Sequence, residues 1–405
     1  MRLSIARAVL MSRLPGWRAG VRLAAVMASR QVDDVIVVGG GIIGLSIARE
    51  AARSGLRVRL FDKGELGGEA SSAAAGLLGP QIDLEEEDPL AALGLASRDL
   101  YPDFARSIAE ESGLDPCLLE RGTLVLARGA EEIRAIDRQA SFQRSLGLQA
   151  ERVGGEALRR LEPSLDPGLT EGLHLPRDWS VDNVLLVRGL GRSAERAGAR
   201  LVEGTRIECL LVEGGRVTGV AAGAEAFRAG TVVIAAGAWS LEIGGDGVPP
   251  LPTRPVRGQM VCLGPSTVPV HPLHAASCYL VPRRDGRVLI GSTMERVGFD
   301  KRVTAGGLAA LAAAAIALVP ALADAPFHSA WAGLRPACED SLPAIGGAGA
   351  PGLLYACGHL RNGILLAPIT AQIVGRLLRG EDPGIDLARF DPRRFETPMG
   401  GRSTR

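Results

Sequence analysis

The sequence predicts a mixed α/β fold with two parts, one built on a parallel sheet and one on antiparallel strands. The first part is indicated near the start of the chain, where a strand-like run at 35–38 leads through a glycine-rich turn into a helix-like run at 42–53. The second is indicated by strand-like segments at 259–263, 278–282 and 287–292, which alternate as antiparallel strands do. A chain of 405 residues is long enough for two or three such domains.

The glycine-rich turn has the GxGxxG spacing, with its glycines at Gly39, Gly41 and Gly44. In this motif the first glycine makes a tight turn, the second lets backbone amides approach a pyrophosphate, and the third lets helix and strand pack closely. A second strand-like run, 58–61, leads to Asp62, which can accept hydrogen bonds from a ribose diol. This order indicates a Rossmann-like site for an adenine dinucleotide. It does not distinguish NAD from FAD, and a glycine-rich turn without a ligand is the alternative.

Two further stretches are predicted to lie at the same site. Residues 231–237 form a buried strand ending in glycine, which would return the parallel sheet to the ligand crevice. Residues 64–79 are rich in small and hydroxyl side chains, which permit close approach to a ligand; a flexible connector is the alternative. Elsewhere the pattern predicts helices at 90–112 and 131–146, a helix ending at 197, a strand at 118–126, and a small meander of strands at 200–203, 207–212 and 216–220.

Composition excludes several classes of partner. The formal net charge is +1, so nothing points to nucleic acid or to an anionic membrane. The six cysteines are scattered without a CxxC pair, which indicates reduced core residues in a reducing compartment, and we expect a cytoplasmic protein. The five histidines show no HxH or HxxxH spacing, so no metal site is predicted.

Two segments resemble targeting or membrane sequences. Residues 1–32 contain six arginines and no acid, as transit peptides do, but an upstream start codon with Met27 as the true beginning is the interpretation we favour. We expect this segment to be disordered or loosely helical. Residues 303–323 carry no charge over a length that could span a membrane, but their alanine content, internal glycines and near-helical spacing predict a core helix that ends near Pro320.

Two arginines near the C-terminus stand beside glycine or proline in apolar surroundings. These are Arg335 and Arg361. A buried arginine must be paired or must face a ligand, and a guanidinium binds a carboxylate with two hydrogen bonds. The alternative is an internal ion pair with an acid such as Glu339 or Asp340, and composition does not decide between the two.

Two other features point toward the same site. The turn at 358–363 can present a helix N-terminus to a cofactor ring, where the helix dipole would stabilise an anion. Tyr279 lies within a strand, where a core tyrosine is the default and a hydroxyl directed into a site is the alternative.

With these residues the chain resembles the glycine oxidases of thiamine biosynthesis, within the D-amino acid oxidase family of FAD enzymes. The resemblance extends over about residues 33–380. The glycine motif is common to many flavoproteins, whereas the C-terminal stretches are close to the pattern of this subfamily. The stretches that carry it are VVGGGIIGLSIA, SSAAAGLLG, TVVIAAGAWS, SCYLVPRRDGRVLIGSTME, WAGLRP and GHLRNGILLAPITA.

The resemblance implies roles for individual residues and non-covalent FAD. Arg335 would bind the substrate carboxylate, Tyr279 would be the active-site tyrosine, and Arg361 the second substrate-side arginine. Adenosine, pyrophosphate and flavin would be bound by Gly39, Gly41, Ile42, Ile43, Gly44, Asp62, Lys63, Ala70, Ser71, Ala75, Gly76, Leu77, Ile207, His359, Leu360, Arg361, Asn362, Gly363, Ile364 and Leu365.

The resemblance also implies a discontinuous Rossmann-like FAD-binding domain and a substrate domain with a large antiparallel sheet. The expected division assigns 33–84, 152–246 and 327–383 to the first, and 85–151 and 247–326 to the second, with a tail at 384–405. Three residues depart from relatives, Ser277, Leu77 and Asn183, and the first two could tune substrate size. Cys338 matches no flavin-linking position, so covalent attachment is not expected.

The implied reaction is oxidation of glycine by hydride transfer to flavin N5, with O2 as acceptor. The products would be hydrogen peroxide and an imine that feeds thiazole synthesis, and the implied partners are the amino acid, O2, further copies in a homotetramer, and the thiazole synthase. Alternatives are an oxidase or dehydrogenase for a bulkier D-amino acid or an N-methyl amino acid, and a non-catalytic FAD-binding protein.

Overall fold

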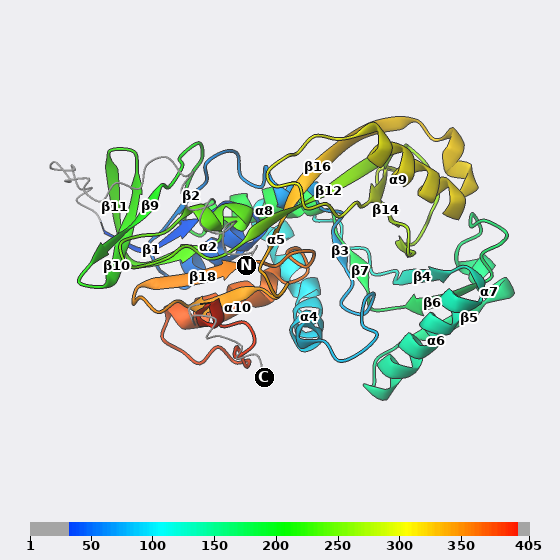
Figure 1. Ribbon diagram of the computed structural model, residues 1–405, viewed down its shortest axis with the longest axis horizontal. Coiled ribbons are helices and arrows are strands. Elements are labelled where there is room, and N and C mark those ends of the chain that lie inside the picture. The colour runs from blue at the N-terminus through cyan, green and yellow to red at the C-terminus, as the bar shows by residue number, and fades with distance from the viewer. Residues whose placement is uncertain (1–31, 396–405) are drawn as a thin grey trace, which may run out of the picture.

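The structure is a computed structural model that describes residues 32–395 (Figure 1). The expectation for residues 1–31, and the last part of the expected tail from 396 on, lie outside the described residues. Within the described range the strands form two eight-stranded sheets and one two-stranded sheet. This mixed α/β architecture confirms the predicted fold class.

The first sheet has a parallel centre that the glycine motif predicted. Its strand order is β17-β18-β11-β1-β2-β8, and β1 pairs in parallel with β2 on one side and with β11 on the other. A small antiparallel extension, β9 and β10, continues from β11. The strands are β1 (Asp33–Val38), β2 (Val58–Phe61), β8 (Arg200–Val202), β9 (Cys209–Glu213), β10 (Arg216–Ala222), β11 (Glu225–Ile234), β17 (Ala344–Gly347) and β18 (Leu353–Cys357).

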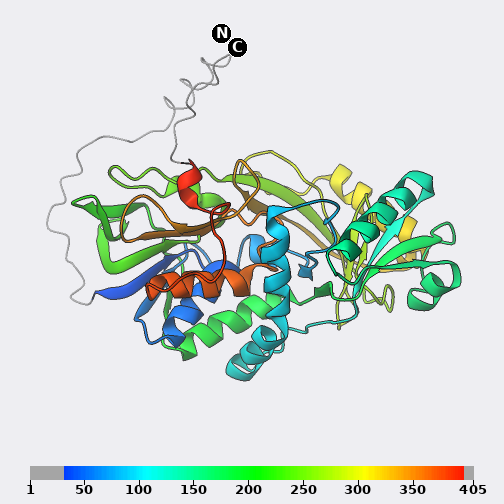
Figure 2. The same cartoon turned by 90° about the horizontal axis from the view of Figure 1, so that it is seen from below.

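Helices cover one face of this sheet. Helices α2 (Ile42–Arg53), α8 (Asn183–Arg196) and α10 (Ala367–Leu378) pack along it, as Figure 2 shows from below. Their apolar sides share one core with alternate residues of the strands, including Val35 and Val37 of β1. The other strand face packs under the β9–β10 extension. Burial on both faces explains why β1 and the end of β11 are continuous apolar runs.

The second sheet is mainly antiparallel and has the order β16-β12-β15-β14-β13-β4-β6-β5. Its longest pair, β12 with β16, is in register from Arg254 opposite Ala337 to Cys262 opposite Ser329, and the register shifts by one residue before Leu263 opposite Phe327. The strands are β4 (Thr123–Ala127), β5 (Glu151–Gly154), β6 (Glu171–Leu175), β12 (Arg254–Leu263), β13 (Leu273–His274), β14 (Tyr279–Pro282), β15 (Val288–Gly291) and β16 (Phe327–Ala337). Helices α6 (Gly129–Ser145), α7 (Gly155–Leu161) and α9 (Ala305–Leu318) accompany it (Figure 1).

The alanine-rich helix confirms its prediction. Thr304 caps α9 by accepting a hydrogen bond from Gly307, and the helix ends before Pro320. Its buried side is formed by Leu311, Ala315 and Leu318, which pack on the second sheet. No helix of residues 32–395 has the length and hydropathy needed to cross a membrane.

Three predicted elements are wrong in extent or pairing. The single helix at 90–112 is two, α4 (Pro89–Asp99) and α5 (Tyr101–Ser112), because Pro102 cannot donate the helical hydrogen bond and its ring would crowd the preceding turn. The strand predicted at 118–126 forms only from Thr123, since Gly122 before it has φ +80°. The strand at 200–203 does not join the meander: β8 pairs in parallel with β2.

The sheets also divide the chain differently from the expected segments. Strands β5, β6 and β16 belong to the second sheet, although 152–246 and 327–383 were assigned to the FAD-binding domain. Conversely α4 and α5 bury apolar side chains in the helical core of the first sheet. The cause is tertiary pairing: β16 pairs along its length with β12, and the apolar sides of α4 and α5 meet α10 and α8. The domain boundaries themselves stay a prediction.

Candidate active site

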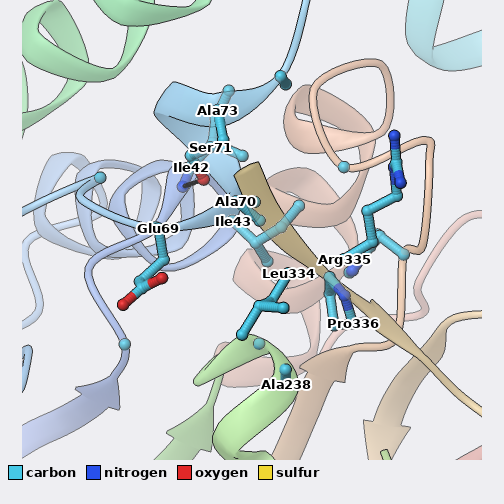
Figure 3. A pocket seen from close by; sticks show the side chains of 18 of the residues that line it. Ile42, Ile43, Glu69, Ala70, Ser71, Ala73, Ala238, Leu334, Arg335 and Pro336 are labelled. Carbon is cyan, nitrogen blue, oxygen red and sulfur yellow. Dashed lines mark hydrogen bonds between the residues drawn. The ribbon is translucent and has the colours of Figure 1, made fainter. Parts of the chain in front are cut away.

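A cavity is lined by the carboxyl ends of β1, β2 and β11 together with residues of β12 and β16. Figure 3 shows some of the lining side chains, among them Ile42, Ser71 and Arg335. The cavity is the crevice in which parallel α/β sheets bind ligands. Most predicted site residues line it: Gly39, Gly41, Ile42, Ile43, Asp62, Lys63, Ala70, Ser71, Ala75, Gly76, Leu77, Ile207, Tyr279, Arg335, His359, Leu360, Arg361, Asn362, Gly363 and Ile364. Gly44 and Leu365 do not line it; both are packed behind it.

The three motif glycines have different physical reasons for being glycine. Gly39 has φ +111°, and a Cβ there would lie 2.4 Å from the carbonyl oxygen of Ala235. A Cβ on Gly44 would lie 1.8 Å from the carbonyl oxygen of Gly39. A Cβ on Gly41 would meet only Ser71 Oγ, at 3.2 Å, and would otherwise project into the cavity. Gly39 and Gly44 therefore serve packing, and Gly41 keeps space for a ligand, as the motif predicts.

The N-terminus of α2 opens into this cavity. Its N-cap, Gly41, has no side chain to bond the first-turn amides, and the Ile42 amide donates to Ser71 Oγ at 2.9 Å. Free amides and the helix dipole at such an end favour an anion. Ser71 itself belongs to the short helix α3 (Ala70–Ala73), so the small-residue stretch predicted to face a ligand does line the cavity.

Asp62 lies at the end of β2 as predicted, but it also fixes its own loop. One carboxylate oxygen accepts from the Gly40 amide at 2.6 Å and the other from the Gly64 amide at 2.8 Å. Each oxygen keeps a further lone pair that can accept from a ribose hydroxyl. The sequence predicted Asp62 as a ligand-binding residue, but it gave no sign of the two loop amides that Asp62 also binds.

The same end of the cavity contains an aromatic residue that sequence reasoning did not select. Lys63 Nζ lies 3.2 Å from the ring centroid of Trp239, a cation–π contact, and burial lowers the pKa of Lys63. Trp239 follows Gly237, which has φ +57° and open space where a Cβ would be. In the sequence, Gly237 at the end of the predicted strand 231–237 was the feature that pointed to this part of the site.

Arg335 is presented to the cavity by the inner end of β16. Its guanidinium donates to the Thr293 carbonyl oxygen at 3.2 Å and to Ser292 Oγ. Within residues 32–395 no carboxylate lies within ion-pairing distance of it. The two acids proposed as its partners are taken: Glu339 pairs with Arg254, and Asp340 pairs with Arg394. The internal ion pair is therefore wrong for Arg335, and its guanidinium is available to a ligand.

Arg361 differs. Its guanidinium pairs with Asp83 at 2.6 Å, and both side chains are about half exposed at the edge of the cavity. The ion-pair alternative thus describes Arg361, although with Asp83 and not with Glu339 or Asp340. Asp83 comes from the acidic stretch 83–88, directly before α4.

Three further polar side chains line the cavity: Tyr279, His359 and His274. The Tyr279 hydroxyl lies 3.4 Å from Met260 Sδ. His359 is buried, bonds Thr370 Oγ1 at 3.1 Å, and burial lowers its pKa to about 3. His274 lines the cavity and burial lowers its pKa also. A lone histidine such as His274 gave no sequence signal. The described part of the chain contains no cluster of three or more histidine, cysteine, aspartate or glutamate side chains suited to a metal.

These residues fit FAD bound without a covalent link. The α2 N-terminus, Gly41 and the small side chains of α3 leave a cradle for a pyrophosphate, and the cavity continues past the 358–364 turn to Arg335. All six cysteines are free. Cys357 lines the cavity, but its thiol donates to the Gly237 carbonyl oxygen and burial raises its pKa to about 11, so it is a poor nucleophile.

Comparison with known proteins agrees with this site. Residues 34–377 match the family model described as DAO, FAD dependent oxidoreductase. The glycine oxidase of Geobacillus kaustophilus is 38% identical over 376 residues, covering 91% of this chain and 98% of that protein. Its crystal structure superposes with a TM-score of 0.84 at 36% identity, covering 89% of this chain and 98% of that one. The chain also matches the bifunctional protein ThiO/ThiG of Trichormus variabilis at 34% identity, covering 90% of this chain and 56% of that relative. The chain therefore belongs to the DAO family of FAD-dependent oxidoreductases.

Proposed function

We propose that this enzyme oxidises glycine, and other small amines such as sarcosine, with O2 as the electron acceptor. The observation that carries the proposal is the Arg335 guanidinium, which faces the cavity without a carboxylate of the described chain beside it. An α-amino acid supplies the missing carboxylate. The names of the relatives at 34–38% identity support the choice of glycine.

The residues that would hold FAD divide along the cavity. Asp62 and Ile207 would hold the adenosine end, the α2 N-terminus and Ser71 the pyrophosphate, and the 359–364 turn the flavin. FAD held there would supply the two-electron acceptor at N5 for a hydride from the substrate α-carbon, and O2 would take up the two electrons, giving hydrogen peroxide and an imine.

The chain's own residues then orient the substrate. Arg335 binds the carboxylate with two N–H donors, which fixes both the position and the direction of the α-carbon. Tyr279 also lines the cavity, with its ring against Gly291. Neither nearby histidine is needed as a base: His359 is engaged with Thr370, and burial favours neutral His274. Hydride transfer from a neutral amine requires positioning more than proton abstraction.

Anaerobic titration of the flavin tests the proposal directly. Purified protein should be yellow, and glycine should bleach it without O2. Oxygen uptake with glycine, sarcosine, D-alanine and D-proline then ranks the substrates. A specificity constant for D-alanine or D-proline ten times that for glycine would replace the glycine assignment with a bulkier substrate, and flavin that no amine bleaches would indicate a non-catalytic FAD protein.

We further propose a place in thiamine biosynthesis. The imine of glycine is either hydrolysed to glyoxylate and ammonia or consumed by thiazole synthesis, and the fused ThiO/ThiG relative supports the second fate. A thiazole synthase would then be the partner, and the enzyme would act in the cytoplasm as a homotetramer. Co-purification with that synthase and the mass of the native particle test these points.

A further inference from the structure

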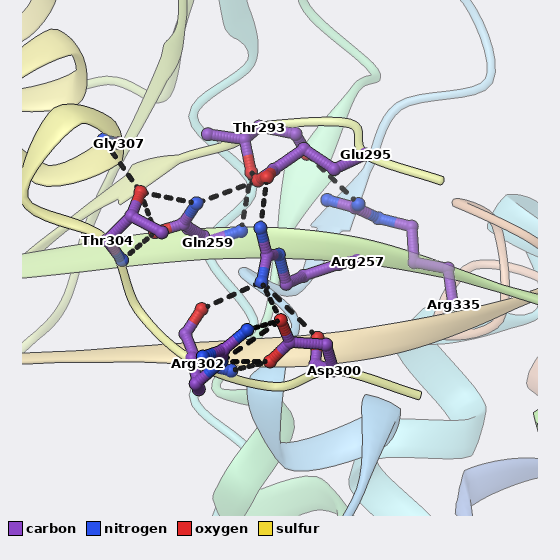
Figure 4. A network of polar contacts seen from close by, with 9 residues as sticks. All are labelled: Arg257, Gln259, Thr293, Glu295, Asp300, Arg302, Thr304, Gly307 and Arg335. Atoms are coloured by element: carbon purple, nitrogen blue, oxygen red, sulfur yellow. Dashed lines mark hydrogen bonds and ion pairs between the residues drawn. The ribbon is translucent and has the colours of Figure 1, made fainter. Parts of the chain in front are cut away.

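A polar network behind Arg335 explains how its guanidinium is held (Figure 4). Both acceptors of Arg335, the Ser292 hydroxyl and the Thr293 carbonyl oxygen, lie directly after β15. They begin the segment of residues 292–304 that runs from β15 to α9. Whatever fixes this segment also fixes the direction of the arginine.

Three consecutive residues of β12, 257–259, make room for the Arg335 guanidinium and hold the segment 292–304. Side chains alternate between the two faces of a strand, so Gly258 differs from its neighbours on either side. A Cβ on Gly258 would lie 2.2 Å from Arg335 Nη1, so the absence of a side chain makes room for the guanidinium. Arg257 and Gln259 carry the long polar side chains that hold the segment 292–304.

Gln259 binds both ends of that segment. Its backbone amide donates to Thr293 Oγ1 at 2.9 Å, and its side-chain Nε2 donates to Glu295 at 2.7 Å. Its Oε1 accepts from the Thr304 amide at 2.8 Å. Gln259 is 1% exposed, so these bonds are shielded from water. Thr293 Oγ1 also donates to the Glu295 carboxylate.

Arg257 anchors the middle of the segment. Its guanidinium pairs with Glu295, and donates to the Arg302 carbonyl oxygen at 3.0 Å. The backbones of Arg257 and Glu295 exchange two hydrogen bonds of 2.9 Å. Because Arg257 bonds lower the pKa of the Glu295 carboxyl to about 2, the pair stays charged across the working pH range.

We propose that Arg257, Gln259 and Thr293 are positioning residues for the substrate carboxylate, acting through Arg335. A long arginine side chain loses rotamer freedom when it binds, and a guanidinium already held in one direction avoids that cost. The inference rests on the proposed role of Arg335 as the carboxylate-binding group. It gives the segment 292–304 the role of supporting the substrate-binding site.

Thr293→Val removes the hydroxyl and keeps the shape. In the holoenzyme, acetate binding measured from the flavin absorption spectrum should weaken about 10-fold, and KM for glycine should rise by a similar factor. FAD content should not change. Thr293→Ser should restore both values. The matched control is Thr218→Val, which removes a threonine hydroxyl bonded to Arg228 at 2.6 Å, on β10 of the other sheet.

The two valine variants should lose similar thermal stability, and only Thr293→Val should lose acetate affinity. Equal acetate affinity in Thr293→Val and the wild type, equal loss in Thr218→Val, or failure of the serine variant to rescue would overturn the inference. If Thr293→Val does not fold, Glu295→Gln provides the second test. Its acetate affinity should fall by about threefold, because the glutamine side chain can still form hydrogen bonds to the network.

The same measurements separate this inference from the proposed function. Wild-type enzyme that binds acetate through Arg335 but is not reduced by glycine would overturn the glycine assignment alone. An Arg335→Ala variant that binds acetate as well as the wild type would overturn the carboxylate role of Arg335, and the positioning inference with it.

Discussion

The two ends of the cavity differ in whether backbone groups or side chains form them. The dinucleotide end is made by backbone: the Gly39 turn, the α2 N-terminus and the amides bonded to Asp62 lie within 26 consecutive residues, 39–64. The substrate end is made by side chains from segments far apart in sequence, with Arg335 held by Ser292 and Thr293. A site formed by backbone should lose its ligand when an added side chain fills the space beside it. A site formed by side chains should lose its ligand when one of those side chains is removed.

The largest effect should come from filling space at the backbone end. Gly44→Ala places a methyl group 1.8 Å from the Gly39 carbonyl oxygen, so either α2 or the turn must move. We expect protein without bound FAD and a loss of roughly 1–3 kcal/mol or more in unfolding free energy. Flavin absorbance per protein and denaturant unfolding measure this. Gly306→Ala in α9 is the control, because nothing lies within 4 Å of its Cβ position.

Removal of the principal side chain at the other end should have the next largest effect and leave FAD bound. Arg335→Ala should weaken acetate binding and raise KM for glycine by about two orders of magnitude, since truncating a charged contact of this kind costs roughly 2–5 kcal/mol. The measurement is spectral titration of the holoenzyme. An unchanged constant would show that the substrate carboxylate binds elsewhere.

A buried carboxylate bonded to the loop that carries Ile82 and Asp83 should make the stability of the protein pH-dependent. Asp178 accepts from the Gln81 amide at 3.0 Å, beneath the loop that carries Asp83. Burial raises its pKa from 3.8 to about 7, although Arg98 lowers it. Folding therefore favours the protonated acid, and this contribution to stability is lost as pH rises from about 4 through 7.

Asp178→Asn should remove that dependence while retaining an oxygen acceptor for Gln81. Wild-type stability in denaturant should fall relative to the variant between pH 5 and pH 8. Parallel curves for the two proteins would mean that Asp178 is charged throughout this range and fully compensated by Arg98.

The smallest effect should come from the second arginine. Arg361→Ala removes a half-exposed ion pair with Asp83, and such pairs contribute about 0–1 kcal/mol. We expect acetate affinity to change by less than about fivefold, with FAD retained. A loss as large as that of Arg335→Ala would show that Arg361 leaves Asp83 to bind the substrate.

The sequence predicted the backbone end better than the side-chain end for a physical reason. Glycine spacing and an apolar run such as 231–237 encode local conformation, so the parallel order of β2, β1 and β11 followed from them. Gly258 and His274 gave no comparable signal, because their roles depend on what lies opposite. The pairing of β16 with β12 was missed for the same reason. The break between α4 and α5 has a local cause, Pro102, which the sequence prediction overlooked.

By itself the sequence determined that the chain has a dinucleotide crevice and two arginines without an obvious use. Only the tertiary structure decided which of the two has no carboxylate partner among residues 32–395. Asp83 lies 278 positions from Arg361 and occupies it, whereas Glu339 and Asp340, four and five positions from Arg335, pair with other arginines. Electrostatic partners are chosen by distance in space, and sequence separation does not measure that distance.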